Sequence, residues 1–96
     1  MKPSDALSQN REMIRSIVEG NRGKNARVFG SVVRGEDDEN SDLDILIDPT
    51  DETTLFDIGA IQHKLNELLG VPVDVLTPMA LPDKFRDTVI AEAVRV

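Results

Sequence analysis

Two spacings of hydrophobic residues alternate along this chain of 96 residues. Repeats of three and four residues, which are typical of one helix face, occur over residues 4–20, 55–69 and 82–96. Short runs rich in β-branched residues, which are typical of strands, occur over residues 27–29, 43–47 and 71–76. This order predicts one domain over residues 1–96 with an α/β (α+β) fold, in which a small mixed β-sheet of three to four strands packs against helices.

The ends of the three predicted helices are marked by capping and breaking residues. Ser4 is expected to cap the first helix, which ends near Gly20 and is followed by a connector over residues 21–25. Gly70 is expected to end the second helix, and Pro82 to open the third, which runs almost to the end of the sequence. The residues expected to face the core are Leu7, Ile14, Ile17, Val18, Ile58, Ile61, Leu65, Leu68, Leu69, Phe85, Val89, Ala93 and Val94.

Two aspartates at the start of the second predicted strand are the first candidates for chemistry. Asp42 and Asp44 are one residue apart, so their side chains share a face of the strand and their Cα atoms are about 6.6 Å apart. Carboxylates held this close repel one another, and their oxygen atoms suit Mg²⁺. Asp48 lies on the same face but about 13 Å from Asp44, too far to join the pair.

Asp74 is the best candidate for a third carboxylate, because it lies in the strand-like run of residues 71–76. Neighbouring strands are about 4.8 Å apart, so Asp74 can face the pair across the sheet. There it would hold a second metal ion and accept the proton of an attacking hydroxyl group. The alternative is an ordinary solvated aspartate at the edge of the sheet.

A candidate phosphate-binding turn follows the first predicted strand. Gly30 allows close approach of a triphosphate, and Ser31 is expected to cap a short helical turn and to donate a hydrogen bond to the phosphate. Arg34 would either bind phosphate or lock the loop through a carbonyl or an acidic side chain. Ser41 would either hydrogen-bond within its loop or contact the nucleotide or a metal-bound water.

The candidate residues form a combination that is far more specific than its parts. It consists of Gly-Ser, a gap of ten residues that contains Arg-Gly, then Asp-x-Asp, and later an apolar strand that contains an aspartate. In these residues the chain resembles the minimal nucleotidyltransferase (MNT) family of the DNA polymerase β nucleotidyltransferase superfamily. The resemblance implies that Gly30 and Ser31 bind nucleotide phosphates. It also implies that Asp42, Asp44 and Asp74 bind two Mg²⁺ ions and carry out catalysis, with ATP as the substrate.

The same resemblance implies a partner. MNT proteins typically act as antitoxins of HEPN-type ribonuclease toxins, by transferring AMP from ATP to a tyrosine hydroxyl of the toxin. A chain of 96 residues has little room for a second domain, so its acceptor is expected on another protein. One alternative is an antitoxin that neutralises the toxin by binding alone, and another is an antibiotic nucleotidyltransferase, which normally has a further domain.

Charge and composition narrow the choice of acceptor. The net charge of −7, the scattered basic residues and the absence of Trp and Tyr argue against a nucleic-acid partner. The acidic run at residues 36–39 is expected to be a solvated loop or, alternatively, a docking site for a basic partner. With no cysteine, no signal peptide and no membrane-spanning run, a cytoplasmic protein is expected.

A few residues outside the motif also carry expectations. His63 falls off the apolar stripe of its helix and is expected to be exposed and without a catalytic role. Apolar residues that a small core does not need in full are candidates for a docking surface, and these are Met79, Ala80, Leu81 and Ile90.

Overall fold

A computed structural model describes residues 1–96 and contains one four-stranded sheet. Its strands are β1 (Gly23–Phe29), β2 (Leu43–Pro49), β3 (Val73–Leu76) and β4 (Val94–Arg95), in the spatial order β3-β2-β1-β4. The β2 and β3 strands are parallel, whereas β1 is antiparallel to both β2 and β4. The predicted α/β class with a small mixed sheet is therefore confirmed.

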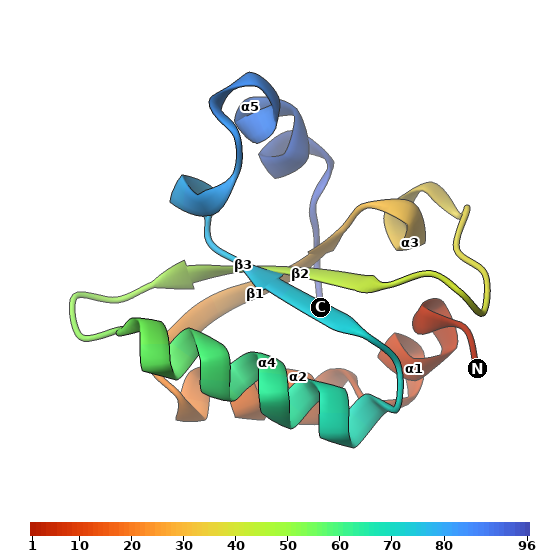
Figure 1. Ribbon diagram of the computed structural model, residues 1–96, viewed down its shortest axis with the longest axis horizontal. Coiled ribbons are helices and arrows are strands. Elements are labelled where there is room, and N and C mark those ends of the chain that lie inside the picture. Colours follow the sequence, from red (N-terminus) through yellow and green to blue (C-terminus); the bar gives the residue numbers. More distant parts are fainter.

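Helices cover the two faces of this sheet unequally (Figure 1). On one face lie α1 (Pro3–Gln9), α2 (Arg11–Gly20) and α4 (Leu55–Leu69). On the other stand the short 3₁₀ helix η1 (Pro78–Ala80) and α5 (Asp83–Glu92), while the single turn α3 (Ser31–Arg34) follows β1 directly. No helix is both long and apolar enough to cross a bilayer.

Strand β2 divides its side chains between two hydrophobic clusters. Leu43, Ile45 and Ile47 belong to the larger cluster, which α1, α2 and α4 help to form. Leu46 belongs to a smaller cluster with Phe29 and Leu81 on the opposite face, which Val89 and Ala93 also contact. Because successive strand residues alternate between faces, Asp42 and Asp44 share the face of Leu46, over which η1 and α5 lie.

The second predicted helix is correct to the residue, and its ends show why. Thr54 and Asp57 form a reciprocal capping box at the start of α4, with Thr54 N–H donating to Asp57 Oδ2 at 2.9 Å. Gly70 ends the helix in the left-handed conformation, with φ of +67°. The end at Gly70 was predicted from the sequence, and the capping box is the structural reason for the start at Leu55.

The first predicted helix is wrong in two respects. It consists of two helices, α1 and α2, because Asn10 adopts φ −135° and its Nδ2 atom donates to the Ala6 carbonyl oxygen. Ser4 does not cap it, since Lys2 occupies the N-cap position and Pro3 the first helical position. The predicted connector over residues 21–25 is also too long, because β1 already begins at Gly23.

The third predicted helix is too long, because α5 ends at Glu92 and β4 pairs with β1. Phe85 and Val94, which were predicted to face the core, are 54% and 53% exposed. Leu81, predicted as part of a docking surface, is instead 5% exposed and lies in the smaller cluster. Met79, at 79% exposure, and the neighbouring Ala80 do lie on the surface, as does Ile90.

Candidate functional site

Two of the predicted carboxylates lie directly opposite each other on parallel strands. Asp44 of β2 is the register partner of Asp74 of β3, and on its other side Asp44 pairs with Phe29 of β1. Asp42 precedes β2 on the face of Asp44. The structure thus brings the three predicted carboxylates to one region of the sheet, with Asp44 half-buried and Asp42 and Asp74 exposed.

The three carboxylates are close enough for their charges to affect the pKa of Asp44. Burial, followed by the charges of Asp74 and Asp42, raises the pKa of Asp44 from 3.8 to about 6, while the charge of Arg34 opposes the rise. A carboxyl group with this pKa is held at a cost when ionised, so a bound cation or a proton relieves it. The site therefore favours positive charge at Asp44.

The donor set fits Mg²⁺, which prefers carboxylate oxygens together with water and phosphate. The side chains are not gathered around a single point, since no three His, Cys, Asp or Glu groups approach closely enough to hold an ion. Closing the set therefore requires rotation of the Asp42 and Asp74 side chains, which are both exposed.

Gly30 approaches the carboxylates more closely than any other residue type could. It adopts φ +78°, a conformation that side chains rarely accept, and a β-carbon there would overlap with Asp44 Oδ2. Gly30 also occupies the N-cap position of α3, so the prediction that Ser31 is the cap is wrong. Ser31 is the first residue of the helical turn, half-buried and next to this close contact.

The other two predicted nucleotide-binding residues make contacts within the α3–β2 loop. Arg34 Nε donates to Glu36 Oε1 at 2.9 Å, and both side chains are largely exposed. Ser41 Oγ accepts a hydrogen bond from Asp38 N–H at 2.9 Å. Two roles were predicted for Arg34 and for Ser41, one within the loop and one at the nucleotide, and the structure contains the loop contact of each residue.

Two further expectations concern Asp48 and His63. Asp48 is separate from the carboxylate group, as predicted, and its carboxylate accepts from Asn25 Nδ2 and Arg27. Burial opposes the change, but these hydrogen bonds lower the pKa of Asp48 below 3.8. His63 is exposed, as predicted.

The acidic run at residues 36–39 contains one residue that sequence reasoning missed. Asp37 Oδ2 accepts from Ser4 N–H at 2.9 Å, which ties the loop before Asp42 to the first turn of α1. This hydrogen bond lowers the pKa of Asp37 below 3.8. No local signal identifies the contact, because 33 residues separate its partners. The remaining three residues of the run are exposed.

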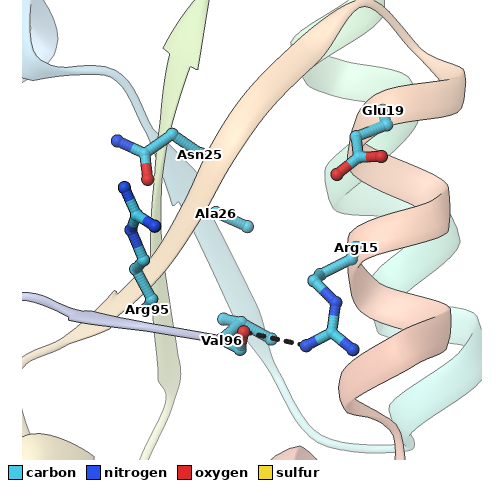
Figure 2. Close-up of a pocket in the computed structure, with 6 residues that line it drawn as sticks. All are labelled: Arg15, Glu19, Asn25, Ala26, Arg95 and Val96. Atoms are coloured by element: carbon cyan, nitrogen blue, oxygen red, sulfur yellow. Dashed lines mark hydrogen bonds between the residues drawn. The ribbon is translucent and has the colours of Figure 1, made fainter.

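A shallow cavity of about 270 Å³ lies away from the carboxylates, between α2, β1 and the end of the chain (Figure 2). Arg15 donates to the Val96 carbonyl oxygen at 2.9 Å across it. The residues that line it are Arg15, Glu19, Asn25, Ala26, Arg95 and Val96. None of the predicted site residues is among them.

Comparison with known proteins identifies the family to which this fold belongs. The family model described as the nucleotidyltransferase domain matches residues 9–96. This chain belongs to that family. A solved chain provisionally named a minimal nucleotidyltransferase superimposes with a TM-score of 0.86 at 36% identity, covering 97% of this nucleotidyltransferase and 95% of that chain. The resemblance to the minimal nucleotidyltransferases of the DNA polymerase β superfamily is confirmed.

Two sequence relatives are described by the reaction they catalyse. Protein adenylyltransferase MntA of Thermococcus cleftensis is 41% identical over 69 residues, which cover 72% of this nucleotidyltransferase and 70% of the relative. A protein of Methanocaldococcus jannaschii, provisionally named a protein adenylyltransferase, is 40% identical over 73 residues, covering 76% and 78%.

A more distant structure has the same fold. This is the crystal structure of a toxin–antitoxin with AMP-PNP, which aligns with a TM-score of 0.75 at 22% identity and covers 90% of this nucleotidyltransferase and 71% of that chain.

Proposed function

We propose that this nucleotidyltransferase is a protein adenylyltransferase that transfers AMP from ATP to a tyrosine hydroxyl of a HEPN-type ribonuclease toxin, and thereby acts as its antitoxin. The observation that carries the proposal is the pairing of Asp44 with Asp74 next to Gly30. The relative of Thermococcus cleftensis, which is named a protein adenylyltransferase, supports the choice of reaction.

The residues of the chain have separate tasks in this reaction. Gly30 lets the backbone of the turn approach the nucleotide phosphates, and Ser31 donates a hydrogen bond to a phosphate oxygen. Asp42, Asp44 and Asp74 would hold two Mg²⁺ ions, which supply positive charge to the reacting phosphate when bound. Asp74, which is exposed on the edge strand β3, accepts the proton of the attacking hydroxyl.

The bonds of the transfer balance as follows. The hydroxyl oxygen of the partner forms a bond to the α-phosphorus of ATP, and the bond between that phosphorus and the bridging oxygen breaks. Pyrophosphate leaves with the bonding electrons, and the hydroxyl proton passes to a carboxylate of the site. The product is an AMP ester on the partner, which adds a bulky negative group where a ribonuclease must bind RNA.

The test is to incubate this chain and its partner with ATP and Mg²⁺ and to measure the intact mass of the partner. We expect a gain of whole AMP units with the wild-type chain and none with Asp42→Ala or Asp44→Ala. A partner that gains no mass, or gains the same mass with both variants, contradicts the proposal.

A second candidate function is neutralisation by binding alone. It is favoured by the fact that the carboxylates are not gathered around one point. The double variant with Asp42→Asn and Asp44→Asn separates the two candidates. Loss of neutralisation in this variant supports catalysis, whereas full neutralisation supports binding alone.

A further inference from the structure

The edge of the sheet at β3 is closed by side chains of α4. Strand β3 pairs with β2 on one side only, and the outward N–H groups of an edge strand are normally left for water or another chain. Here Val73 N–H donates to Asn66 Oδ1 at 2.7 Å, and Val75 N–H donates to Gln62 Oε1 at 2.9 Å. Both acceptor side chains are half-buried.

The two bonds form together because the spacings of helix and strand match. Gln62 and Asn66 are four residues apart on α4, a rise of about 6.0 Å along the helix axis. Val73 and Val75 are two residues apart on β3, a rise of about 6.6 Å. The later helix residue binds the earlier strand residue, as expected for a helix and a strand that run in opposite directions.

Asp74 lies between the two bonded N–H groups. Its backbone is therefore fixed on both sides from α4, in addition to the pairing with Asp44 in β2. The β3 strand has only four residues, so each of these bonds is a large share of what holds it. A carboxylate that binds a metal ion or accepts a proton works only within a narrow range of positions.

We propose that Gln62 and Asn66 are positioning residues that hold Asp74 opposite Asp44 for nucleotidyl transfer. This inference rests on the proposed function for its effect on catalysis, but its structural part can be tested without any reaction. Both side chains accept hydrogen bonds from the backbone of β3, so both act through that backbone.

Matched variants isolate the hydrogen bonds. Gln62→Met and Asn66→Leu remove the acceptor oxygen at similar volume, whereas Gln62→Glu and Asn66→Asp keep an acceptor oxygen at the same reach. Glu67→Met is the control, because Glu67 is an exposed neighbour on the same helix. Three quantities are measured for each variant: amide hydrogen exchange by NMR, Mg²⁺ affinity by calorimetry, and kcat and KM for AMP transfer.

Asn66→Leu should accelerate amide exchange at Val73 about tenfold, and Gln62→Met should do the same at Val75, since in each case a partly buried donor loses its partner. Exchange at Ile45 should not change. Mg²⁺ affinity and kcat should each fall about tenfold, with KM for ATP within about twofold. The variants that keep an acceptor, and the Glu67→Met control, should remain within about threefold of wild type in all three quantities.

The outcomes separate this inference from the proposed function. If Gln62→Met and Gln62→Glu behave alike, or if exchange at Val73 and Val75 is unchanged, the inference is wrong. It is also wrong if exchange accelerates while Mg²⁺ affinity and kcat stay at wild-type values. If the wild-type chain transfers no AMP, the proposed function fails, and amide exchange and Mg²⁺ affinity still decide the inference.

Discussion

The carboxylate of Asp44 occupies the position that a β-carbon on Gly30 would take, so that such a β-carbon would overlap with Oδ2 of Asp44. The contact joins the turn after β1 to the carboxylate of β2, two segments that face each other through the Phe29–Asp44 register pair. The motif therefore needs glycine at position 30 for two reasons: residues with a side chain rarely adopt φ of +78°, and the Asp44 carboxylate leaves no room for a β-carbon.

We expect Gly30→Ala to lower the free energy of unfolding by about 3 kcal/mol and to abolish AMP transfer, since both strain and overlap must be relieved. Gly35→Ala is the control, because Gly35 is in the left-handed helical region, with φ +70° and ψ +24°, and has open space around it. It should cost only about 1 kcal/mol. Chemical denaturation of the two variants measures the difference, and equal costs would show that the overlap with Asp44 does not matter.

Asp44→Asn should make the protein more stable and inactive. The pKa of Asp44 is raised by burial and by the charges of Asp74 and Asp42, so removing its charge relieves a cost at neutral pH. In a chelating buffer we expect a higher free energy of unfolding than in wild type, together with a loss of transfer activity of at least about 100-fold. Asp42→Asn is the exposed control and should change stability less. A less stable Asp44→Asn protein would contradict this account.

Asp57 provides a pH-dependent contribution to stability. Arg22 Nε and an Nη atom donate to its two carboxylate oxygens at 3.0 and 2.8 Å, and the side chain is almost completely buried. The hydrogen bond from Arg22, followed by that from Thr54 N–H, lowers the pKa of Asp57 below 3.8. Because the pKa is lower in the folded protein, this stabilisation is present above 3.8 and is lost as pH falls through the folded value.

We therefore expect Asp57→Asn to be less stable than wild type at pH 7, with a difference that narrows as the pH falls below the ordinary value of 3.8. Urea unfolding of both proteins across this range measures it. Asp51→Asn, a substitution in the exposed loop before α4, is the control and should give parallel curves. A constant difference between Asp57→Asn and wild type at all pH values would mean that the lost capping geometry, not the charge, is responsible.

How far the sequence predicts this fold depends on how local each signal is. The bounds of α4 follow from apolar spacing and from Gly70, all within one segment. The two-residue strand β4 could not be predicted, because it exists only through pairing with Arg27 and Val28, far back in the chain. The helical spacing of Val89, Ala93 and Val94 led instead to a predicted helix that extends several residues beyond the end of α5 at Glu92.

The same distinction applies to the site. The shared face of Asp42 and Asp44 follows from strand parity alone. The facing position of Asp74 was one of two alternatives, because it depends on the parallel pairing of β2 with β3, which strand spacing does not determine. The bond from Ser4 to Asp37 and the bonds from β3 to Gln62 and Asn66 join side chains to distant backbone. Amide and carboxylate side chains of this kind look like ordinary surface residues until the partner segment is placed.

Leu81 belongs to the smaller hydrophobic cluster and not to the predicted docking surface. It is 5% exposed and packs with Phe29 and Leu46, which lie under α5. We expect Leu81→Ala to lower the free energy of unfolding by about 2 to 4 kcal/mol, since it leaves a cavity in a small cluster. Met79→Ala, at a position two residues away that is 79% exposed, should change it by no more than about 0.5 kcal/mol. If Leu81→Ala and Met79→Ala had similarly small effects on thermal or chemical unfolding, Leu81 would be a surface residue.

Arg34 has two possible roles, and one pair of substitutions separates them. Its charge reaches Asp44, where it opposes the raised pKa, yet its guanidinium group is paired with Glu36 in the loop. We expect Arg34 to leave Glu36 for the nucleotide, because a triphosphate offers more negative charge than one exposed carboxylate.

Arg34→Gln should then raise KM for ATP about tenfold, since a hydrogen bond to a charged group contributes about 1.5 to 3 kcal/mol. Glu36→Gln should lower KM for ATP, because it frees the guanidinium group from its competitor. Steady-state kinetics of AMP transfer, with unfolding curves as the control for stability, measure both changes. If Glu36→Gln raises KM as much as Arg34→Gln does, the pair serves to hold the loop, and Arg34 does not bind phosphate.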